Sequence, residues 1–386
     1  MLIFFIHGVA TRDVKYADSM KSAIREEFKR VGESLPHFYA SFWGNALSDV
    51  TKMWNCISQD LQQVKQEAPQ KSIENVFRYQ QFREGLLSEF VGDMFTYLNP
   101  TRGVEIRNLL AQQLVSFIND HPQEDELCII SHSLGSVILW DVLFSERFEK
   151  GDPAFQIRSK LRGFDQGQEQ KQVNLSTLIT MGSPILFINT MLAVNPAQIH
   201  QFIKRSQNEV FQWFNILHAS DIIAYPLKSS LNLEPLLHSN MKDIYIDTYV
   251  NSAEQAALLA NQENVAMAIA SAEAHTGYWK CQKTIQVILR QILPLHNLLR
   301  VAVDYLRNVP GMTPYEKIEF AVLEQVLDLL VFKDGSGRLI HITNPAKIHH
   351  VRVFNKDDSL FFAGYVGWMH VGGLEKAIAS LKNNLY

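Results

Sequence analysis

The stretch CIISHSLGSVILW, from Cys128 to Trp140, joins two apolar runs through a short polar break. The first run is typical of a buried strand and the second of a helix, a pairing that is common in α/β proteins. Ser133 lies at the junction, with the small residues Ser131 and Gly135 two positions before and after it. A sharp strand-to-helix turn needs small residues there, and it presents the central hydroxyl at the edge of a sheet. Ser133 is therefore a candidate nucleophile, and the alternative is an ordinary buried strand and helix.

The remainder of the chain indicates the kind of sheet to which this turn belongs. Residues 2–8 (LIFFIHG) form an apolar run, residues 13–32 show helical spacing, and residues 36–45 read as a second strand. A strand, helix, strand pattern with short joins predicts a parallel sheet covered by helices, and so an α/β fold. Further strands are predicted within residues 174–185, 210–223 and 242–250.

The chain is long enough for one large domain, or for a domain of ordinary size with an appended module, and we favour the second arrangement. Residues 45–114 are mostly helical in pattern, more than a simple crossover needs, and we expect a lid-like insert there. Near the end, a helix is expected over 314–330, then two hairpins and a last helix. We predict a first domain over residues 1–308 and a small C-terminal α+β module over residues 309–386.

Composition excludes several classes of function. With 47% hydrophobic and 20% charged residues and a net charge of -4, the chain resembles a globular protein without a basic face for nucleic acid. Cys56, Cys128 and Cys281 are too far apart for a disulfide framework or a zinc site, so we expect no metal site and a reducing compartment. The apolar run at the N-terminus is too short for a signal peptide or a membrane span. We expect a cytoplasmic protein without a transmembrane segment, although specialised secretion signals leave no mark in composition.

Residues 173–203 contain no Asp, Glu, Lys or Arg. We expect a buried strand followed by a core-facing helix here, and the sharper alternative is that part of the segment lines an apolar substrate pocket.

The His7-Gly8 pair at the end of the first predicted strand lies well ahead of Ser133 in the chain. A glycine at this point lets the backbone curl, so that the N–H of Val9 can join the N–H of Leu134 in binding an oxyanion. The helix that starts after Ser133 adds the positive end of its dipole. A plain glycine turn is the alternative.

A serine nucleophile needs a base and an acid that orients the base, and in this architecture the acid comes before the base along the chain. Asp221 follows a predicted strand at its C-terminal end, where α/β sheets carry their sites, while Asp243 and Asp247 compete with it. His275 lies in a short break after an alanine-rich helical segment. The histidines that compete with it are His238, His341, His349, His350 and His370.

Taken together, the motifs IHG, SHSLGS, MGSP, WFN with SD, and HTGYW occur in an order that resembles the α/β-hydrolase superfamily of serine esterases and lipases. They look most like bacterial lipase-like hydrolases related to the inositol-deacylase type, over residues 1–308. The resemblance implies an α/β-hydrolase fold, with a nucleophile at Ser133, an acid at Asp221 and a base at His275. It departs from the family at Ser131, where glycine is usual, and in lacking strands before the first one.

The resemblance implies cleavage of carboxylic esters, including those of lipids, through an acyl-enzyme on Ser133, without a cofactor. One alternative is a hydrolase-like scaffold that only binds a partner. Another is amide cleavage or acyl transfer by the same residues. The partner expected is an ester or lipid-like small molecule, and the C-terminal module offers a further protein or lipid contact.

Overall fold

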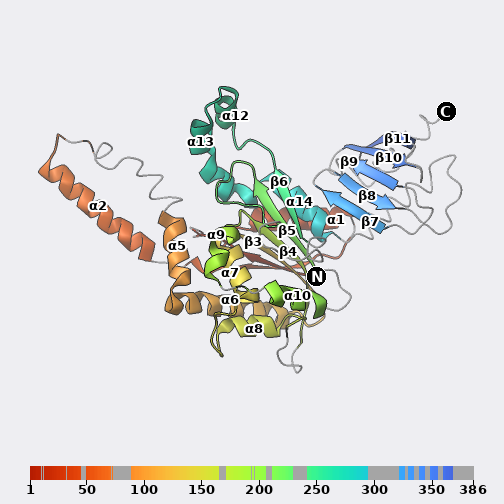
Figure 1. The fold of residues 1–386 in the computed structure, drawn as a ribbon, viewed down its shortest axis with the longest axis horizontal. Helices are drawn as coiled ribbons and strands as arrows, with labels where there is room; N and C mark the ends of the chain where they lie inside the picture. Colours follow the sequence, from red (N-terminus) through yellow and green to blue (C-terminus); the bar gives the residue numbers. More distant parts are fainter. Residues whose placement is uncertain are drawn as a thin grey trace. The chain divides into compact units, whose positions relative to one another are not determined.

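The structure is a computed structural model of the chain (Figure 1). Beyond residue 320 only the backbone of the strands is described. The structure describes all residues except 10, 12, 32, 45–48, 71, 73–87, 165–170, 193, 195, 206–210, 229–240, 294–320, 327–328, 334–338, 344–347, 355–359 and 368–386.

The chain divides into two compact units, one formed by Met1–Lys21 and Pro36–Thr284 and the other by Ser22–Leu35 and Ile285–Tyr386. The domain boundary that the sequence predicts between residues 308 and 309 lies outside the described residues. Among the described residues, each unit contains one sheet.

The first unit is built on a six-stranded sheet in the order β2-β1-β3-β4-β5-β6, in which every neighbouring pair is parallel. The α/β class and the parallel sheet predicted from the sequence are confirmed. β2 is added on one side of β1, whereas β3 and all later strands are added on its other side. The strand order therefore switches between β1 and β3, and α/β sheets bind ligands at such a switch point. The strands are β1 (Leu2–Ile6), β2 (His37–Ser41), β3 (Glu126–His132), β4 (Asn174–Met181), β5 (Gln212–His218) and β6 (Met241–Ile246).

The sheet is buried on both faces, which explains why its central strands are continuously apolar rather than alternating. On one face, Phe4 of β1 stacks on Tyr39, with ring centroids 5.5 Å apart, and packs against Phe117 of α6 (Pro100–Asp120). On the other face, Phe5 packs against Trp279. Figure 1 shows α6 and α8 (Pro153–Ser159) together in one layer, with α7 (Leu134–Phe144) beside them. All 11 residues of α7 are buried, and all of them except Gly135, Ser136 and Asp141 are large and apolar.

The remaining described helices are α1 (Asp18–Val31), α2 (Asp49–Glu67), α5 (Ser88–Leu98), α9 (Ile185–Ile188), α10 (Pro196–Arg205), α12 (Ser252–Leu259), α13 (Glu263–Thr276) and α14 (Gln282–Ile292), with the 3-10 turns η3 (Asn189–Met191) and η4 (Gly277–Trp279). Within the described ranges, none of the helices has the length and apolarity needed to cross a membrane.

The predicted insert over residues 45–114 contains α2, α5 and the first part of α6. Met94 and Tyr97 of α5 and Leu110 of α6 belong to the hydrophobic core. The last part of the segment therefore covers the sheet. The uncharged segment at 173–203 contains β4, α9, η3 and most of α10, in agreement with a strand followed by helical structure.

The second unit contains an antiparallel sheet in the order β11-β10-β9-β8-β7. The helix expected over 314–330 is wrong from Ala321 onward, because this segment forms β7 and the start of β8. Its helical spacing is outweighed by pairing with neighbouring strands, since strand formation depends on cross-strand contacts more than on local preference. The expected last helix lies outside the described residues. The strands are β7 (Ala321–Val326), β8 (Leu329–Lys333), β9 (Leu339–Thr343), β10 (Ile348–Phe354) and β11 (Leu360–Gly367).

Candidate active site

Ser133 lies in a sharp turn between β3 and α7. Its φ of 52° and ψ of -128° are outside the regions that non-glycine residues favour. The turn is held by a 2.9 Å hydrogen bond from the Ser133 N–H to the carbonyl oxygen of Met181, at the end of β4. Two glycines make room for it. A Cβ on Gly8 would lie 2.5 Å from the Ser133 Cβ, and a Cβ on Gly135 would lie 2.3 Å from the His7 carbonyl oxygen.

Three side chains from different parts of the chain meet at this turn. His275, at the end of α13, has its Nε2 2.8 Å from the Ser133 Oγ. Its Nδ1 is 3.0 Å from each carboxylate oxygen of Asp221, which follows β5. All three residues are buried. The structure thus brings together the serine, histidine and aspartate that the sequence selects as candidates.

Asp221 is held ionised in this buried position. Burial raises its pKa, but the hydrogen bonds from His275, the Ile223 N–H and the Tyr278 hydroxyl outweigh burial and leave the pKa below its usual value. An ionised carboxylate only accepts hydrogen bonds, so the His275 Nδ1 carries a proton. In the neutral imidazole the lone pair is then on Nε2, which accepts the hydrogen bond from the Ser133 hydroxyl.

The peptide between Gly8 and Val9 is also held in one orientation. The Trp43 N–H donates to the His7 Nε2 at 3.1 Å, so the proton of this imidazole is on Nδ1, which donates to the Gly8 carbonyl at 2.7 Å. Because the peptide is trans, the Val9 N–H points away from that carbonyl. The other predicted donor, the Leu134 N–H, is at the first position of α7 and has no partner within the helix.

Ser131 and His132, the two residues before Ser133, hold the turn through hydrogen bonds to neighbouring segments. Ser131 is buried and donates a 3.2 Å hydrogen bond to the Ile179 carbonyl on β4. Its hydroxyl is thus accommodated by the neighbouring strand. The His132 Nε2 donates to the His275 carbonyl at 2.7 Å, which ties the segment with the candidate base to β3.

The residues that competed with Asp221 have other partners. Asp243 accepts from the Asn215 side chain and from the N–H groups of Leu227 and Lys228, and Asp247 pairs with Lys283. Among the competing histidines, His341, His349 and His350 are in the strands of the second unit, while His238 and His370 lie outside the described residues.

Sequence reasoning missed two residues of the site. Tyr278 donates to Asp221, and Gly182, at φ 57°, lies against the cluster so closely that a Cβ would be 2.8 Å from the Tyr278 ring and 2.9 Å from Asp221 Oδ2. Both lie inside motifs that we quoted, MGSP and HTGYW. A glycine and a tyrosine are common in loops and cores, so the letters alone did not distinguish them.

In the described part of the chain, no group of three or more His, Cys, Asp or Glu residues is arranged to hold a metal ion. The Cys56, Cys128 and Cys281 thiols are free. Neither a protein-family model nor a curated protein matches the chain.

Proposed function

We propose that this protein is a serine hydrolase of the α/β-hydrolase type that cleaves carboxylic esters, including those of lipids. The observation that carries the proposal is the continuous hydrogen-bonded line from Ser133 through His275 to Asp221. A hydroxyl, an imidazole and a carboxylate in this order are the arrangement that activates a serine for attack on an acyl carbon.

In the proposed reaction, the Ser133 Oγ attacks the ester carbonyl and its proton passes to the His275 Nε2. The N–H groups of Val9 and Leu134 bind the oxyanion that develops. His275 then gives the proton to the departing alkoxide, and an acyl ester remains on Ser133. Water attacks this ester with His275 as the base, and the release of a carboxylic acid restores the enzyme.

The geometry supports an enzyme more than a binding scaffold. A scaffold needs no hydrogen bond between Ser133 and His275, and it has no use for a serine at an unfavourable φ. Amide cleavage and acyl transfer use the same three residues, so product identification with and without added alcohols separates them from ester hydrolysis.

Access to the site is part of the proposal. Ser133 and His275 are buried, so a neighbouring segment must move before a substrate reaches them. We assign the lid role to α2 of the 45–114 insert or to α12 and α13, because α5 and α6 contribute to the core and α13 ends next to His275.

The test is labelling with a fluorophosphonate probe, which reacts with activated serines. We expect the wild type to be labelled and to hydrolyse p-nitrophenyl esters, and Ser133→Ala to lose labelling and at least about a thousandfold in kcat/KM. Ser116→Ala is the matched control, because Ser116 is an exposed residue of α6 whose hydroxyl donates to Asp120. A wild-type protein that neither labels nor hydrolyses any ester would refute the proposal.

A further inference from the structure

Tyr278 connects the segment of the candidate base to the strand of the candidate acid. It lies in η4, three positions after His275, and its side chain is buried. Its hydroxyl donates to the Asp221 Oδ2 at 2.9 Å and accepts from the His218 N–H, at the end of β5, at 2.8 Å. One hydroxyl therefore joins three parts of the site.

The two carboxylate oxygens of Asp221 have matching surroundings. Oδ1 accepts from the Ile223 N–H at 2.9 Å and Oδ2 from Tyr278, and each oxygen is 3.0 Å from the His275 Nδ1. One fixed donor on each oxygen prevents rotation of the carboxylate about its Cβ–Cγ bond. Both oxygens are thus presented to the imidazole at the same distance.

The ring of Tyr278 has little room to move. Because Gly182 has no side chain, the edge of the Tyr278 ring, the Asp221 carboxylate and the His275 imidazole can all approach its Cα closely. On another side, the His132 ring lies 5.5 Å from the Tyr278 ring, centroid to centroid. The position of the hydroxyl is therefore set by packing as well as by its two hydrogen bonds.

We propose that Tyr278 is a positioning residue of the proposed hydrolase, whose hydroxyl orients Asp221 and through it sets the proton affinity of the His275–Asp221 pair. This inference rests on the proposed function for its effect on turnover. Its effect on protonation is independent of turnover, because the three side chains are in contact in the free protein.

The sign of the effect follows from the direction of the hydrogen bond. Burial and the nearby charge of Asp221 raise the pKa of Tyr278, so its hydroxyl stays protonated and always donates. The positive end of this O–H group stabilises the carboxylate charge. Without it, the pair takes up a proton at higher pH. The other titratable groups around the pair are His132 on β3, His218 on β5, Glu254 on α12 beside His218, and Cys281 after η4.

The variant Tyr278→Phe keeps the ring and removes only the hydroxyl. We expect kcat to fall about tenfold with KM within about twofold, because a hydrogen bond to a charged group is lost outside the substrate site. The acidic limb of the kcat/KM profile, which reports the His275–Asp221 pair, should move up by about one pH unit.

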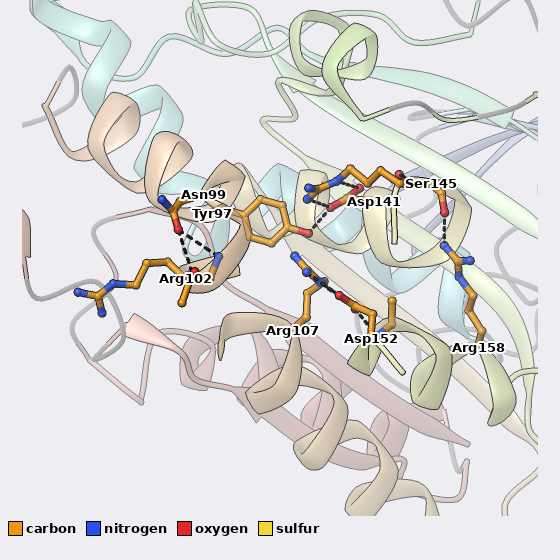
Figure 2. A network of polar contacts seen from close by, with 11 residues as sticks. Tyr97, Asn99, Arg102, Arg107, Asp141, Ser145, Asp152 and Arg158 are labelled. Atoms are coloured by element: carbon orange, nitrogen blue, oxygen red, sulfur yellow. Dashed lines mark hydrogen bonds and ion pairs between the residues drawn. The ribbon is translucent and has the colours of Figure 1, made fainter. Parts of the chain in front are cut away.

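Tyr97→Phe is the matched control. Tyr97 of α5 is also buried, and it donates a 2.5 Å hydrogen bond to the buried carboxylate of Asp141 on α7 (Figure 2). The same substitution there removes the same kind of bond. It is expected to lower the melting temperature without moving the acidic limb.

A second measurement separates this inference from the proposed function. NMR of protein labelled with 13C-aspartate and 15N-histidine follows protonation of the pair without any substrate, with Asp221→Asn for assignment. A midpoint that rises in Tyr278→Phe and not in Tyr97→Phe supports the inference, even if the fluorophosphonate probe labels nothing. An unchanged midpoint in Tyr278→Phe overturns it, even in an active enzyme.

Discussion

Ser133 and Asn261 are the only non-glycine residues with a positive φ in the described part of the chain. Asn261 lies in the turn between α12 and α13, and asparagine tolerates the left-handed region well. Serine has no such tolerance, and its conformation costs about 1–3 kcal/mol. The turn is retained because Gly8 and Gly135 leave space for it and β4 binds its N–H group. Strain concentrated at the hydroxyl that contacts the His275 imidazole is consistent with the proposed nucleophile.

The buried imidazole of His132 makes the stability of the protein depend on pH. Burial, with a contribution from the nearby His275, lowers the pKa of His132 to about 3. In the unfolded chain a histidine takes up its proton near pH 6.5. Between these values the unfolded state binds more protons than the folded state, so stability falls as the pH falls. From pH 7 to pH 5 this residue alone should remove about 2 kcal/mol from the free energy of unfolding.

Urea unfolding at the two pH values checks this prediction against His132→Gln, whose side chain does not titrate. The other histidines are the same in both proteins, so the difference between the two pH dependences isolates His132. Equal losses in wild type and variant would show that His132 is not buried in its neutral form.

At the scale of elements, α5, α6, α7 and α8 are joined by buried ion pairs and hydrogen bonds (Figure 2). Asp141 of α7 accepts from Tyr97 of α5 and from two nitrogens of Arg147. The guanidinium of Arg107 on α6 forms a bidentate salt bridge with the carboxylate of Asp152, the N-cap residue of α8. The helix that begins at Ser133 is therefore held by polar contacts as well as by its apolar surface.

Asp152 is the residue of this network whose loss we expect to be most damaging. It caps α8 through the Ala154 N–H at 2.9 Å and pairs with Arg107, and both charged side chains are buried. Asp152→Ala leaves the guanidinium buried without its partner, so the free energy of unfolding should fall by about 3–5 kcal/mol. Asp152→Asn keeps the cap and should retain about 1 kcal/mol of this. Denaturant titration measures both variants, and equal stability of wild type and Asp152→Ala would contradict the prediction.

For the whole molecule, the strand order explains where the site lies. Gly8 follows β1 and Ser133 follows β3, so they flank the position where the order switches and the loops of the sheet diverge. Asp221 follows β5 at the same edge. Parallel strands bring their C-terminal ends to one edge, so residues far apart in the chain meet there.

The second unit contributes none of the three candidate site residues. Ser133, Asp221 and His275 all belong to the first unit, while β7 to β11 belong to the second. A chain ending at Leu293 should therefore keep its circular dichroism signal for helix and label with the fluorophosphonate probe at the rate of the full chain. The truncated Ser133→Ala variant is the control. Loss of labelling in a folded truncated chain would show that the second unit is needed to complete the site.

Local sequence patterns were sufficient for much of this protein. The apolar run at Leu2–Ile6, the small residues around Ser133 and the alternation of strands and helices predicted a parallel α/β sheet and the turn at Ser133. These features depend on residues within a few positions of one another, because apolar spacing and the need for small side chains act locally. Chain order also selected Asp221 and His275 as candidates.

Other features were decided only by contacts between distant segments. His275 and Ser133 are 142 positions apart, and they form a hydrogen bond because parallel strands bring their C-terminal ends to one edge of the sheet. The same arrangement places Asp221, and not Asp243, beside His275. Tyr278 and Gly182 belong to the site only through their contacts with Asp221, which comes from a different segment of the chain. The segment from Ala321 forms a strand because its neighbours supply hydrogen bonds across the sheet, and pairing of this kind leaves no local pattern that a single segment can show.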